Sequence, residues 1–367
     1  MRIVVKVGTS TLAHATGRLN IRHVEQLVKV LSDLKNAGHE MILVSSGAIG
    51  MGVGKLNLPG RPGDMPTKQA AAAVGQCELM YTYDKLFSEY NHTVAQILLT
   101  GEDVDHADRR RNFENTMSRL LELGALPIIN ENDTIATEEI KVGDNDTLGA
   151  LVTNLVEADV LVILTDQQGL YTADPRKDPE AMFVSVATAG DPVLEKMAGG
   201  AASSLSKGGM ITKILAAKRA ARSGAGTIIA SGRETDVLTR LARGELIGTH
   251  LRPSSTVLHA RKQWIADHLR ASGSLVLDEG AAKALVAKHT SLLPVGVIGV
   301  KGEFVRGEVV SCLTEDGCEI ARGLVNYSSD DASRILRAHT EEIEERLGYM
   351  EQPEMIHRDN MVVLAGE

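Results

Sequence analysis

Apolar residues along the first two thirds of the chain fall into short unbroken runs that alternate with longer stretches of helical periodicity. The runs are rich in Val, Ile and Leu, which is typical of strands buried on both faces of a sheet. They are predicted as strands at Arg2–Val7, Met41–Val44, Val94–Leu99, Leu126–Ile129, Val160–Leu164 and Thr227–Ala230.

The stretches between these runs repeat apolar residues every three or four positions, as the buried face of a helix requires. Asn20 is a good N-cap for the first helix, and Gly38 follows its end. Further helices are predicted over Lys68–Leu86, up to Gly124, over Asn145–Val156, and from Gly208-Gly209 through Arg222 to Gly224. Strands that alternate with helices predict parallel crossovers and therefore an α/β fold, a three-layer αβα sandwich with a mainly parallel sheet.

The pattern changes after residue 252. Residues 253–273 resemble a linker with some helical character, and beyond them short apolar runs are separated by glycine. Such runs predict a small β-rich domain over residues 274–367, after an αβα domain over residues 1–252. Its strands are expected at Val295–Val300, Gly302–Val305 and Gly307–Val310.

Composition narrows the class of protein. The 367 residues carry a formal net charge of −9, so bulk electrostatics disfavour a dedicated nucleic-acid binder. Cys77, Cys312 and Cys318 lack the spacing of a zinc site and are expected to be reduced thiols. The start of the sequence has no leader-like segment, and no apolar run is long enough to span a bilayer. A cytoplasmic protein without a membrane partner is therefore expected.

Two familiar phosphate-binding motifs are only partly present. Gly54-Lys55 would end a P-loop, but Ile49 stands where the first glycine belongs. Gly50 and Gly52 would begin a dinucleotide fingerprint, but Lys55 stands at its third glycine position. Both motifs are therefore rejected.

Polar segments follow four of the predicted strands, at the edge where open α/β sheets bind ligands. Lys6 lies late in the first strand and precedes Gly8 and Thr9, so its ammonium and nearby N–H groups could face a phosphate. By itself this segment is better read as an edge lysine and an ordinary turn. Ser45–Ala48 could bind an anion where the next helix begins, and a simple helix cap is equally well supported.

The other two segments are also ambiguous when each is taken alone. Asn130–Asp133 and Gly143–Asp146 offer amides and carboxylates that could hold an ammonium group, although these residue types also form turns. Thr165-Asp166 is followed much later by Gly208–Lys213, where a glycine pair opens a helix that contains a lysine. That arrangement fits either a phosphate site or a flexible loop with a surface lysine.

In their order along the chain, these segments resemble the amino-acid kinase family. The matching stretches are VVKVGTS, VSSGAIG, PIINENDTIAT, KVGDNDTLGA, LTDQQGLYTADPR and GGMITK. The resemblance is greatest to members that act on glutamate and carry a C-terminal PUA domain, which the β-rich region resembles. It implies the amino-acid kinase fold and transfer of the γ-phosphate of ATP to the side-chain carboxylate of glutamate. The product would be an acyl phosphate, the first intermediate toward proline.

The resemblance also implies roles for individual residues. Lys6 and Lys213 would flank the transferred phosphate, and Asp146 would orient the lysines or the metal. The residues implied for glutamate are Ser46, Asp133 and Asn145, with Thr9, Gly47, Ala48 and Asn130 nearby. Those implied for the nucleotide are Lys6, Thr165, Asp166, Gly208, Gly209, Met210, Ile211, Thr212 and Lys213. Mg²⁺ would bridge the phosphates, and no protein residue is assigned as its ligand.

A carboxylate nucleophile needs no general base. With a pKa of about 4.3 it is already ionised at neutral pH, so the obstacle is the approach of an anion to a polyanion. Catalysis is therefore expected to rest on positioning and on neutralising charge. The loop at Gly208-Gly209 departs from the family pattern Gly-Thr-Gly-Gly-Met, because it begins Ser206-Lys207 and Lys207 stands where a threonine is usual. Its extra charge is expected to be solvated.

The C-terminal region is strongly acidic. Residues 275–367 carry 17 acidic and 9 basic side chains, a net charge of −8. PUA domains elsewhere bind RNA, but an RNA-binding face is usually basic, so a structural or regulatory role is expected here.

The alternative functions for the whole protein are a kinase of another small carboxylate such as aspartate, or an RNA-binding regulator with an inactive kinase fold. The resemblance further suggests feedback inhibition by proline, and a homo-oligomer is expected.

Overall fold

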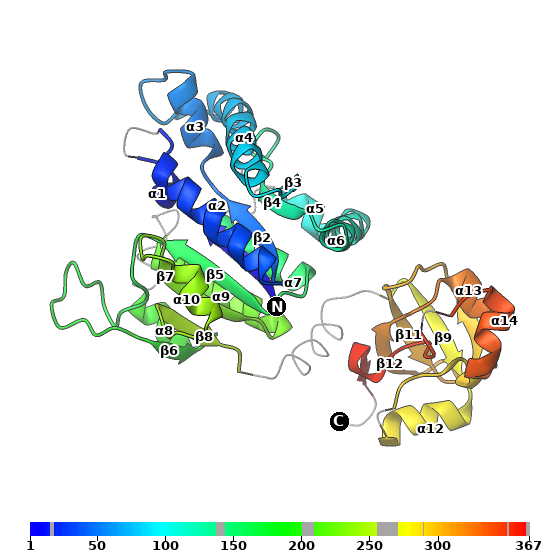
Figure 1. Cartoon of the computed structure of the whole chain (residues 1–367). Coiled ribbons are helices and arrows are strands. Elements are labelled where there is room, and N and C mark those ends of the chain that lie inside the picture. The colour runs from blue at the N-terminus through cyan, green and yellow to red at the C-terminus, as the bar shows by residue number, and fades with distance from the viewer. Residues whose placement is uncertain are drawn as a thin grey trace. The chain divides into compact units, whose positions relative to one another are not determined.

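The computed structural model describes residues 1–14, 18–136, 144–199, 209–254, 271–288, 290–350 and 352–364. The chain divides into two compact units, Met1–Ser254 and Ser255–Glu367, each with its own sheet and core (Figure 1). The predicted linker over residues 253–273 stays a prediction, because residues 255–270 lie outside the described part of the chain.

The first unit is built on a sheet of eight strands. They are β1 (Arg2–Val7), β2 (Glu40–Ser45), β3 (Val94–Leu99), β4 (Leu126–Glu131), β5 (Val160–Thr165), β6 (Val186–Thr188), β7 (Gly226–Ser231) and β8 (Thr249–Arg252). Their order in the sheet is β3-β4-β2-β1-β5-β7-β8-β6, and neighbouring strands are parallel except for β7 and β8. The mainly parallel sheet is therefore confirmed, while β6 and β8 are additions to the six predicted strands.

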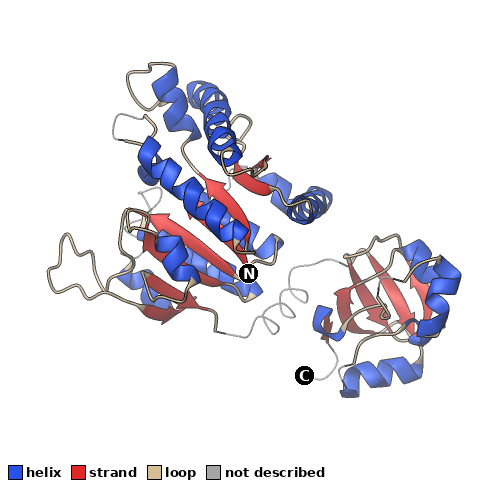
Figure 2. Cartoon of the chain, in the orientation of Figure 1, coloured by secondary structure: helices blue, strands red, loops and turns tan. Residues whose placement is uncertain are grey.

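Helices lie on both faces of this sheet, as the three-layer prediction requires (Figure 2). They are α1 (Thr9–Leu12), α2 (Ile21–Asn36), α3 (Ala48–Lys55), α4 (Met65–Ser88), α5 (Gly101–Asp105), α6 (Ala107–Glu122), α7 (Asn145–Leu155), α8 (Pro192–Met197), α9 (Met210–Ala220) and α10 (Val237–Ala242). Ile3, Val5 and Val7 of β1 pack in one core cluster with α2, α4 and α10, whereas Val4 packs in another with α6, α7 and α9. Because alternate residues of a strand share a face, Lys6 is directed to the side of α7 and α9.

The helix ends follow the signals in the sequence. The Asn20 side chain accepts a hydrogen bond from the His23 N–H, and Gly38 has a φ of +90° just beyond the end of α2. Asp64 caps α4 in the same way by accepting from the Thr67 N–H at 2.9 Å. Gly224 has a φ of +84° after the helical turn that follows α9. The predicted starts and ends of α2 and α9 are thus confirmed to within a few residues.

The second unit has a five-stranded sheet and its own apolar core. Its strands are β9 (Gly273–Leu277), β10 (Val297–Lys301), β11 (Val309–Leu313), β12 (Glu319–Leu324) and β13 (Met361–Val363), in the order β10-β9-β11-β12-β13. Its α-helices are α12 (Glu279–Lys288), α13 (Ser329–Arg334) and α14 (Ile343–Leu347). The β-rich domain is confirmed.

One predicted strand of this unit is wrong. Residues 302–305 form a loop, in which Gly302 has a φ of +80° and the Val305 N–H donates to the Glu308 carboxylate at 2.6 Å. Gly307 has a φ of +83°, so the next strand begins only at Val309. Glycine in this left-handed conformation turns the chain and ends the extended backbone that the apolar pattern suggested.

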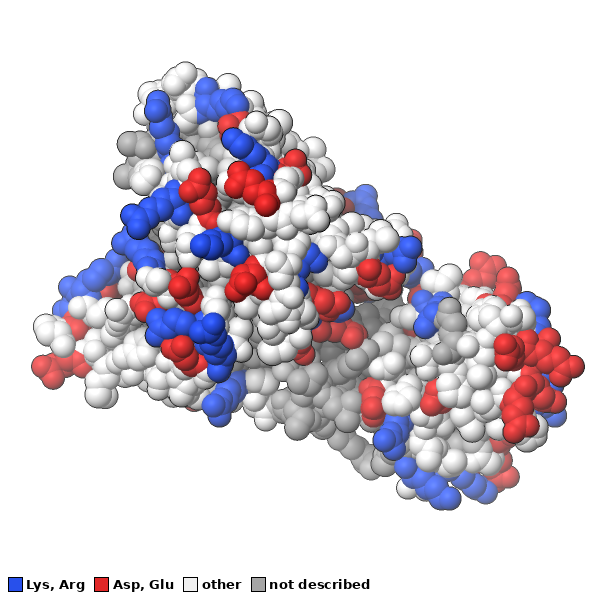
Figure 3. Space-filling model, viewed as in Figure 1, with Lys and Arg blue, Asp and Glu red and all other residues white. Residues whose placement is uncertain are grey.

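Acidic side chains gather on the second unit around α13 and α14 (Figure 3). Those in the first turns of these helices and of the short helix before α14 are Asp330, Asp331, Glu341, Glu342, Glu344 and Glu345. Within the described residues, no helix of either unit has the length and apolar character needed to cross a bilayer.

Candidate active site

Two buried lysines share one buried carboxylate at the edge of the first sheet. Lys6 Nζ lies 2.7 Å from Oδ1 of Asp146, and Lys213 Nζ lies 2.9 Å from Oδ2 of the same side chain. The exposed fractions of Lys6, Asp146 and Lys213 are 6%, 1% and 4%. The Thr212 hydroxyl, 2.7 Å from Oδ2, also donates to this carboxylate. The predicted catalytic residues are therefore brought together.

Three different elements supply these side chains. Lys6 lies near the end of β1, the strand between β2 and β5. Asp146 lies in the first turn of α7, whose start is fixed by Asp144, since the Asp144 side chain accepts from the N–H groups of Asp146 and Thr147. Lys213 is one turn into α9, which begins at Met210. A strand end and two helix starts therefore converge on one point.

Burial sets the protonation of this cluster. It lowers the pKa of Lys6 below its usual value, because desolvation and the nearby Lys213 charge outweigh the attraction of Asp146. Burial alone would raise the pKa of Asp146, but the two lysines and the Thr212 hydroxyl hold that pKa below its usual value. The cluster thus holds two lysine side chains and one carboxylate in a buried environment, with Asp144 close enough to act on Lys6. An anion beside the two lysines would be favoured when both are protonated.

A cavity of about 700 Å³, here called the β4 cavity, opens beside the cluster at the ends of β1, β2 and β4. Lys6, Asp146 and Lys213 form part of its wall. All seven residues predicted for glutamate also line it: Thr9, Ser46, Gly47, Ala48, Asn130, Asp133 and Asn145. Arg61, in the loop between α3 and α4, lines it as well and was not predicted.

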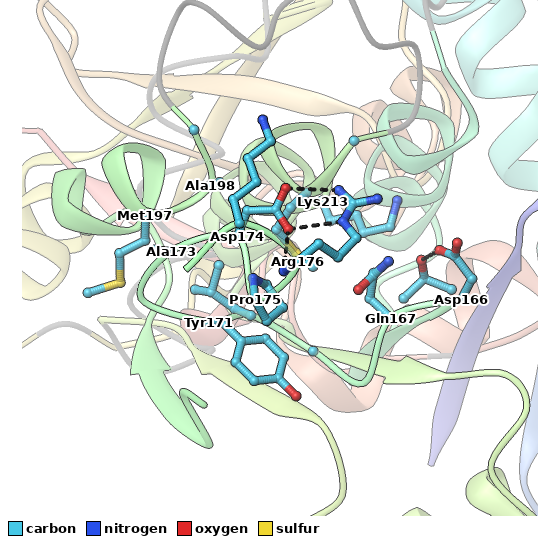
Figure 4. Close-up of a pocket in the computed structure, with 17 residues that line it drawn as sticks. Asp166, Gln167, Tyr171, Ala173, Asp174, Pro175, Arg176, Met197, Ala198 and Lys213 are labelled. Carbon is cyan, nitrogen blue, oxygen red and sulfur yellow. Dashed lines mark hydrogen bonds and ion pairs between the residues drawn. The ribbon is translucent and has the colours of Figure 1, made fainter. Parts of the chain in front are cut away.

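A second cavity of about 610 Å³, here called the α9 cavity, lies beyond the end of β5 (Figure 4). Of the residues predicted for the nucleotide, it is lined by Thr165, Asp166, Gly209, Met210 and Lys213. Its wall also includes Tyr171, Asp174 and Arg176, which belong to the matching stretch LTDQQGLYTADPR but were not predicted as site residues. Arg176 Nε and Nη2 donate to the two Asp174 carboxylate oxygens at 3.0 and 3.1 Å.

The two cavities meet at the lysine cluster, because Thr165, Asp166 and Lys213 line both. Two molecules bound in them would therefore face each other across Lys213. Among the described residues predicted for the nucleotide, Ile211 and Thr212 line neither cavity, and Thr212 instead contacts Asp146. Gly208 and Lys207 lie outside the described residues.

Amide side chains organise the wall of the β4 cavity. Asn145 Nδ2 donates to Ser46 Oγ at 2.7 Å and to Asn130 Oδ1 at 3.0 Å, and it lies 3.3 Å from the Ser45 carbonyl. Asn130 Nδ2 in turn donates to Gln76 Oε1 at 2.9 Å. Gln76, a buried residue of α4, was not predicted. The one available signal was an amide at the end of the small-residue run AAAAVG.

Close helix packing holds the Ser46–Ala48 turn in place. Gly47 has a φ of +110°, so the chain can turn sharply from β2 into α3. Where α3 meets α4, a Cβ on Gly75 would come within 1.7 Å of the Ala48 carbonyl oxygen. A Cβ on Gly52 would come within 1.8 Å of the Ala71 carbonyl oxygen. Only glycine fits at these crossings, which fixes the start of α3 against the wall of the β4 cavity.

Oxygen donors beside the lysines suit a magnesium ion. Asp144 and Asp166 line the β4 cavity next to the cluster, and carboxylate oxygens are ligands that Mg²⁺ accepts directly or through water. Within the described residues, no group of three or more His, Cys, Asp and Glu side chains is arranged to hold a metal by itself. The residues present therefore fit an ion that arrives with a phosphate ligand.

Known proteins match nearly the whole chain. The amino acid kinase family matches residues 1–231, and the PUA domain matches residues 273–347. A glutamate 5-kinase from Laribacter hongkongensis is 59% identical over 99% of this chain and 98% of its own length. Another from Azoarcus sp. is 57% identical over 99% of this chain and 97% of its own length. The structure of carbamate kinase from Giardia lamblia bound to AMP-PNP has a similar fold, with a TM-score of 0.50, 17% identity and coverage of 68% and 98%.

Proposed function

Because the chain belongs to the amino acid kinase family, we propose that it transfers the γ-phosphate of ATP to the side-chain carboxylate of glutamate. The product is glutamyl 5-phosphate, and the reaction is the first step of proline biosynthesis. The observation that carries this proposal is the match, at 59% identity over 99% of the chain, to a relative named glutamate 5-kinase. The two cavities that meet at the lysine cluster support it independently.

Glutamate occupies the β4 cavity in this proposal. Asp133 is suited to its ammonium group, and the hydroxyl of Ser46 can donate to one of its carboxylate oxygens. Asn145 donates to Ser46 and leaves its own side-chain oxygen as an acceptor for the substrate ammonium. Arg61 is a further cation of the wall and fits the α-carboxylate, which leaves both buried lysines for the transferred group. Thr9, Gly47, Ala48 and Asn130 complete this part of the wall.

ATP occupies the α9 cavity. Thr165, Asp166 and the start of α9 at Gly209 and Met210 line the space in which a nucleotide reaches Lys213. The first N–H groups of α9 lack partners within the helix, so they and the helix dipole favour a phosphate there. Mg²⁺ bound with ATP supplies charge neutralisation at the phosphate oxygens.

Catalysis in this proposal rests on charge and position. Lys6 and Lys213 approach the transferred group from β1 and α9, and both ammonium groups stabilise the charge that builds up on it. Asp146 keeps the two ammonium groups a fixed distance apart and is a positioning residue. The nucleophilic carboxylate is already ionised, so no side chain has to accept its proton.

Three further features belong to the proposal. Proline, a smaller relative of the substrate, would inhibit by binding at or near the β4 cavity, and the protein would be a homo-oligomer. We assign the protein to the cytoplasm, as suits an enzyme of amino-acid biosynthesis. The acidic second unit has a structural or regulatory role, since its surface around α13 and α14 repels RNA phosphates.

A hydroxylamine trap tests the proposed function. The protein is incubated with ATP, Mg²⁺ and either glutamate or aspartate, and acyl hydroxamate is measured. Hydroxamate is expected with glutamate and little with aspartate, whose shorter side chain would not reach the transferred phosphate from the same ammonium site. No hydroxamate with glutamate would overturn the proposal. Tight binding of tRNA at physiological salt, measured by gel shift, would favour the RNA-binding alternative.

A further inference from the structure

A line of amide hydrogen bonds runs from the interior of α4 to the wall of the β4 cavity. It passes from Gln76 to Asn130 and on to Asn145, which reaches Ser46. Gln76 and Asn130 are 7% and 3% exposed, so water cannot easily substitute for these partners. Each amide group has one donor end and one acceptor end, so all the groups in the line must donate toward the same end of it.

A backbone carbonyl fixes that direction at one end. The Ser45 carbonyl can only accept, so the side-chain end of Asn145 that lies 3.3 Å from it must be the NH₂ group. The same NH₂ group lies 3.0 Å from Asn130, which must therefore present its oxygen. The NH₂ group of Asn130 then faces Gln76, which must present its own oxygen at 2.9 Å. In this arrangement each NH₂ group of the line faces an oxygen.

The direction has a consequence at the cavity wall. Ser46 Oγ accepts a hydrogen bond from Asn145 at 2.7 Å, so its own proton remains available for a molecule in the β4 cavity. If the Asn145 amide turned over, its oxygen would face Ser46 and would compete for that proton. The orientation of the buried amides therefore decides whether Ser46 can donate to an incoming carboxylate.

We propose that Gln76 is a positioning residue of the β4 cavity, whose side-chain oxygen holds Asn130 and Asn145 in the orientation that leaves the Ser46 proton to the glutamate substrate. This inference rests on the proposed function. It explains why an amide follows the small-residue run of α4 at a buried position, where an apolar side chain would avoid the cost of desolvation. The close contact of Gly75 with Ala48 keeps this part of α4 beside the cavity.

Two substitutions of nearly equal size test the inference. Gln76→Met keeps the volume but removes the strong acceptor, whereas Gln76→Glu keeps an acceptor toward Asn130. For Gln76→Met we expect the glutamate KM to rise about tenfold or more, with the ATP KM within about twofold of wild type. Gln76→Glu should restore a glutamate KM within about threefold of wild type, since its carboxyl oxygen replaces the lost acceptor.

Gln26→Met is the matched control, because Gln26 is an exposed glutamine of α2 that donates to Asp236 at 2.8 Å. It should leave both KM values unchanged. A Gln76→Met protein with an unchanged glutamate KM would overturn the inference, even though wild-type hydroxamate formation upheld the proposed function. Wild-type protein without hydroxamate would overturn both. If Gln76→Met did not fold, Gln76→Glu alone would decide, and a glutamate KM raised more than about tenfold would count against the inference.

Discussion

Lys6 and Lys213 come from opposite ends of the first unit's sequence, yet their ammonium groups lie on the two oxygens of the same carboxylate, at 2.7 and 2.9 Å from Asp146. Each carboxylate oxygen thus pairs with one ammonium group, and the carboxylate separates the two like charges. The three side chains place two ammonium groups beside one carboxylate, and Asp144 is a further negative charge near Lys6. A phosphate group that enters the β4 cavity would lie against both ammonium groups.

Replacing Lys213 with alanine should reduce kcat strongly. Its ammonium group faces the point where the two cavities meet, so it should contribute more to the transition state than to the binding of either substrate. The kcat of Lys213→Ala is expected to fall by about a hundredfold to a thousandfold or more, with a modest change in glutamate KM. Steady-state kinetics measures both quantities.

Lys218 offers the control on the same helix. It lies at the surface and forms an exposed ion pair of 2.8 Å with Glu195. Lys218→Ala removes the same number of atoms and one charge, yet its kcat should stay close to that of the wild type. A near-normal kcat for Lys213→Ala would remove Lys213 from the mechanism.

Asp133→Ala should weaken the binding of glutamate without changing the binding of ATP. Asp133 lines the β4 cavity and does not line the α9 cavity, so the change removes a carboxylate suited to the substrate ammonium. The glutamate KM is expected to rise by about tenfold to a hundredfold, as for the loss of a hydrogen bond between charged groups. The ATP KM should not change. A variant whose ATP KM rose instead would show that the two cavities have been assigned to the wrong substrates.

Alkaline pH should weaken ATP binding before it lowers kcat. Burial lowers the pKa of Lys6 in the free protein, so this ammonium loses its proton as the pH rises toward its usual value of 10.5. Bound phosphate stabilises the charged form and raises that pKa. The fall of kcat/KM for ATP, which reports the free enzyme, should therefore occur at lower pH than the fall of kcat. Two pH–rate profiles that fall together would contradict the role given to Lys6.

Gly75→Ala should damage both stability and glutamate binding. The new methyl group would lie 1.7 Å from the Ala48 carbonyl oxygen, so α3 and α4 must separate. Overpacking of this kind costs about 1–3 kcal/mol or more, and the unfolding temperature should fall by several degrees. The glutamate KM should rise as well, because the turn that carries Ser46 leads into α3. Gly63→Ala is the control, since nothing lies within 4 Å of its added Cβ.

The sequence was a good guide to the six main strands and to the helices between them. Each buried strand of a parallel sheet is an apolar run, and Asn20, Gly38 and Gly224 mark helix ends by local chemistry. The short strands β6 and β8 carry no such pattern. Their burial alternates or is partial, so they depend on neighbours that only the folded chain supplies.

The site was predicted from residues that follow strands, and this rule missed residues on other elements. Gln76 lies in the middle of α4, and only the fold brings it within 2.9 Å of Asn130. Arg61 lies in a loop, and a charged residue in a loop is unremarkable until a cavity is found beside it. The predicted strand at residues 302–305 failed for a different reason, since the glycines that separated the apolar runs were turning the chain.

The meeting of the two cavities has a consequence for the order of events in turnover. Most of each wall belongs to one cavity alone, and the shared residues are Thr165, Asp166 and Lys213. A molecule bound in one cavity therefore leaves most of the other cavity's wall free. Such a geometry favours a random sequential scheme with a ternary complex, in which ADP competes with ATP and not with glutamate.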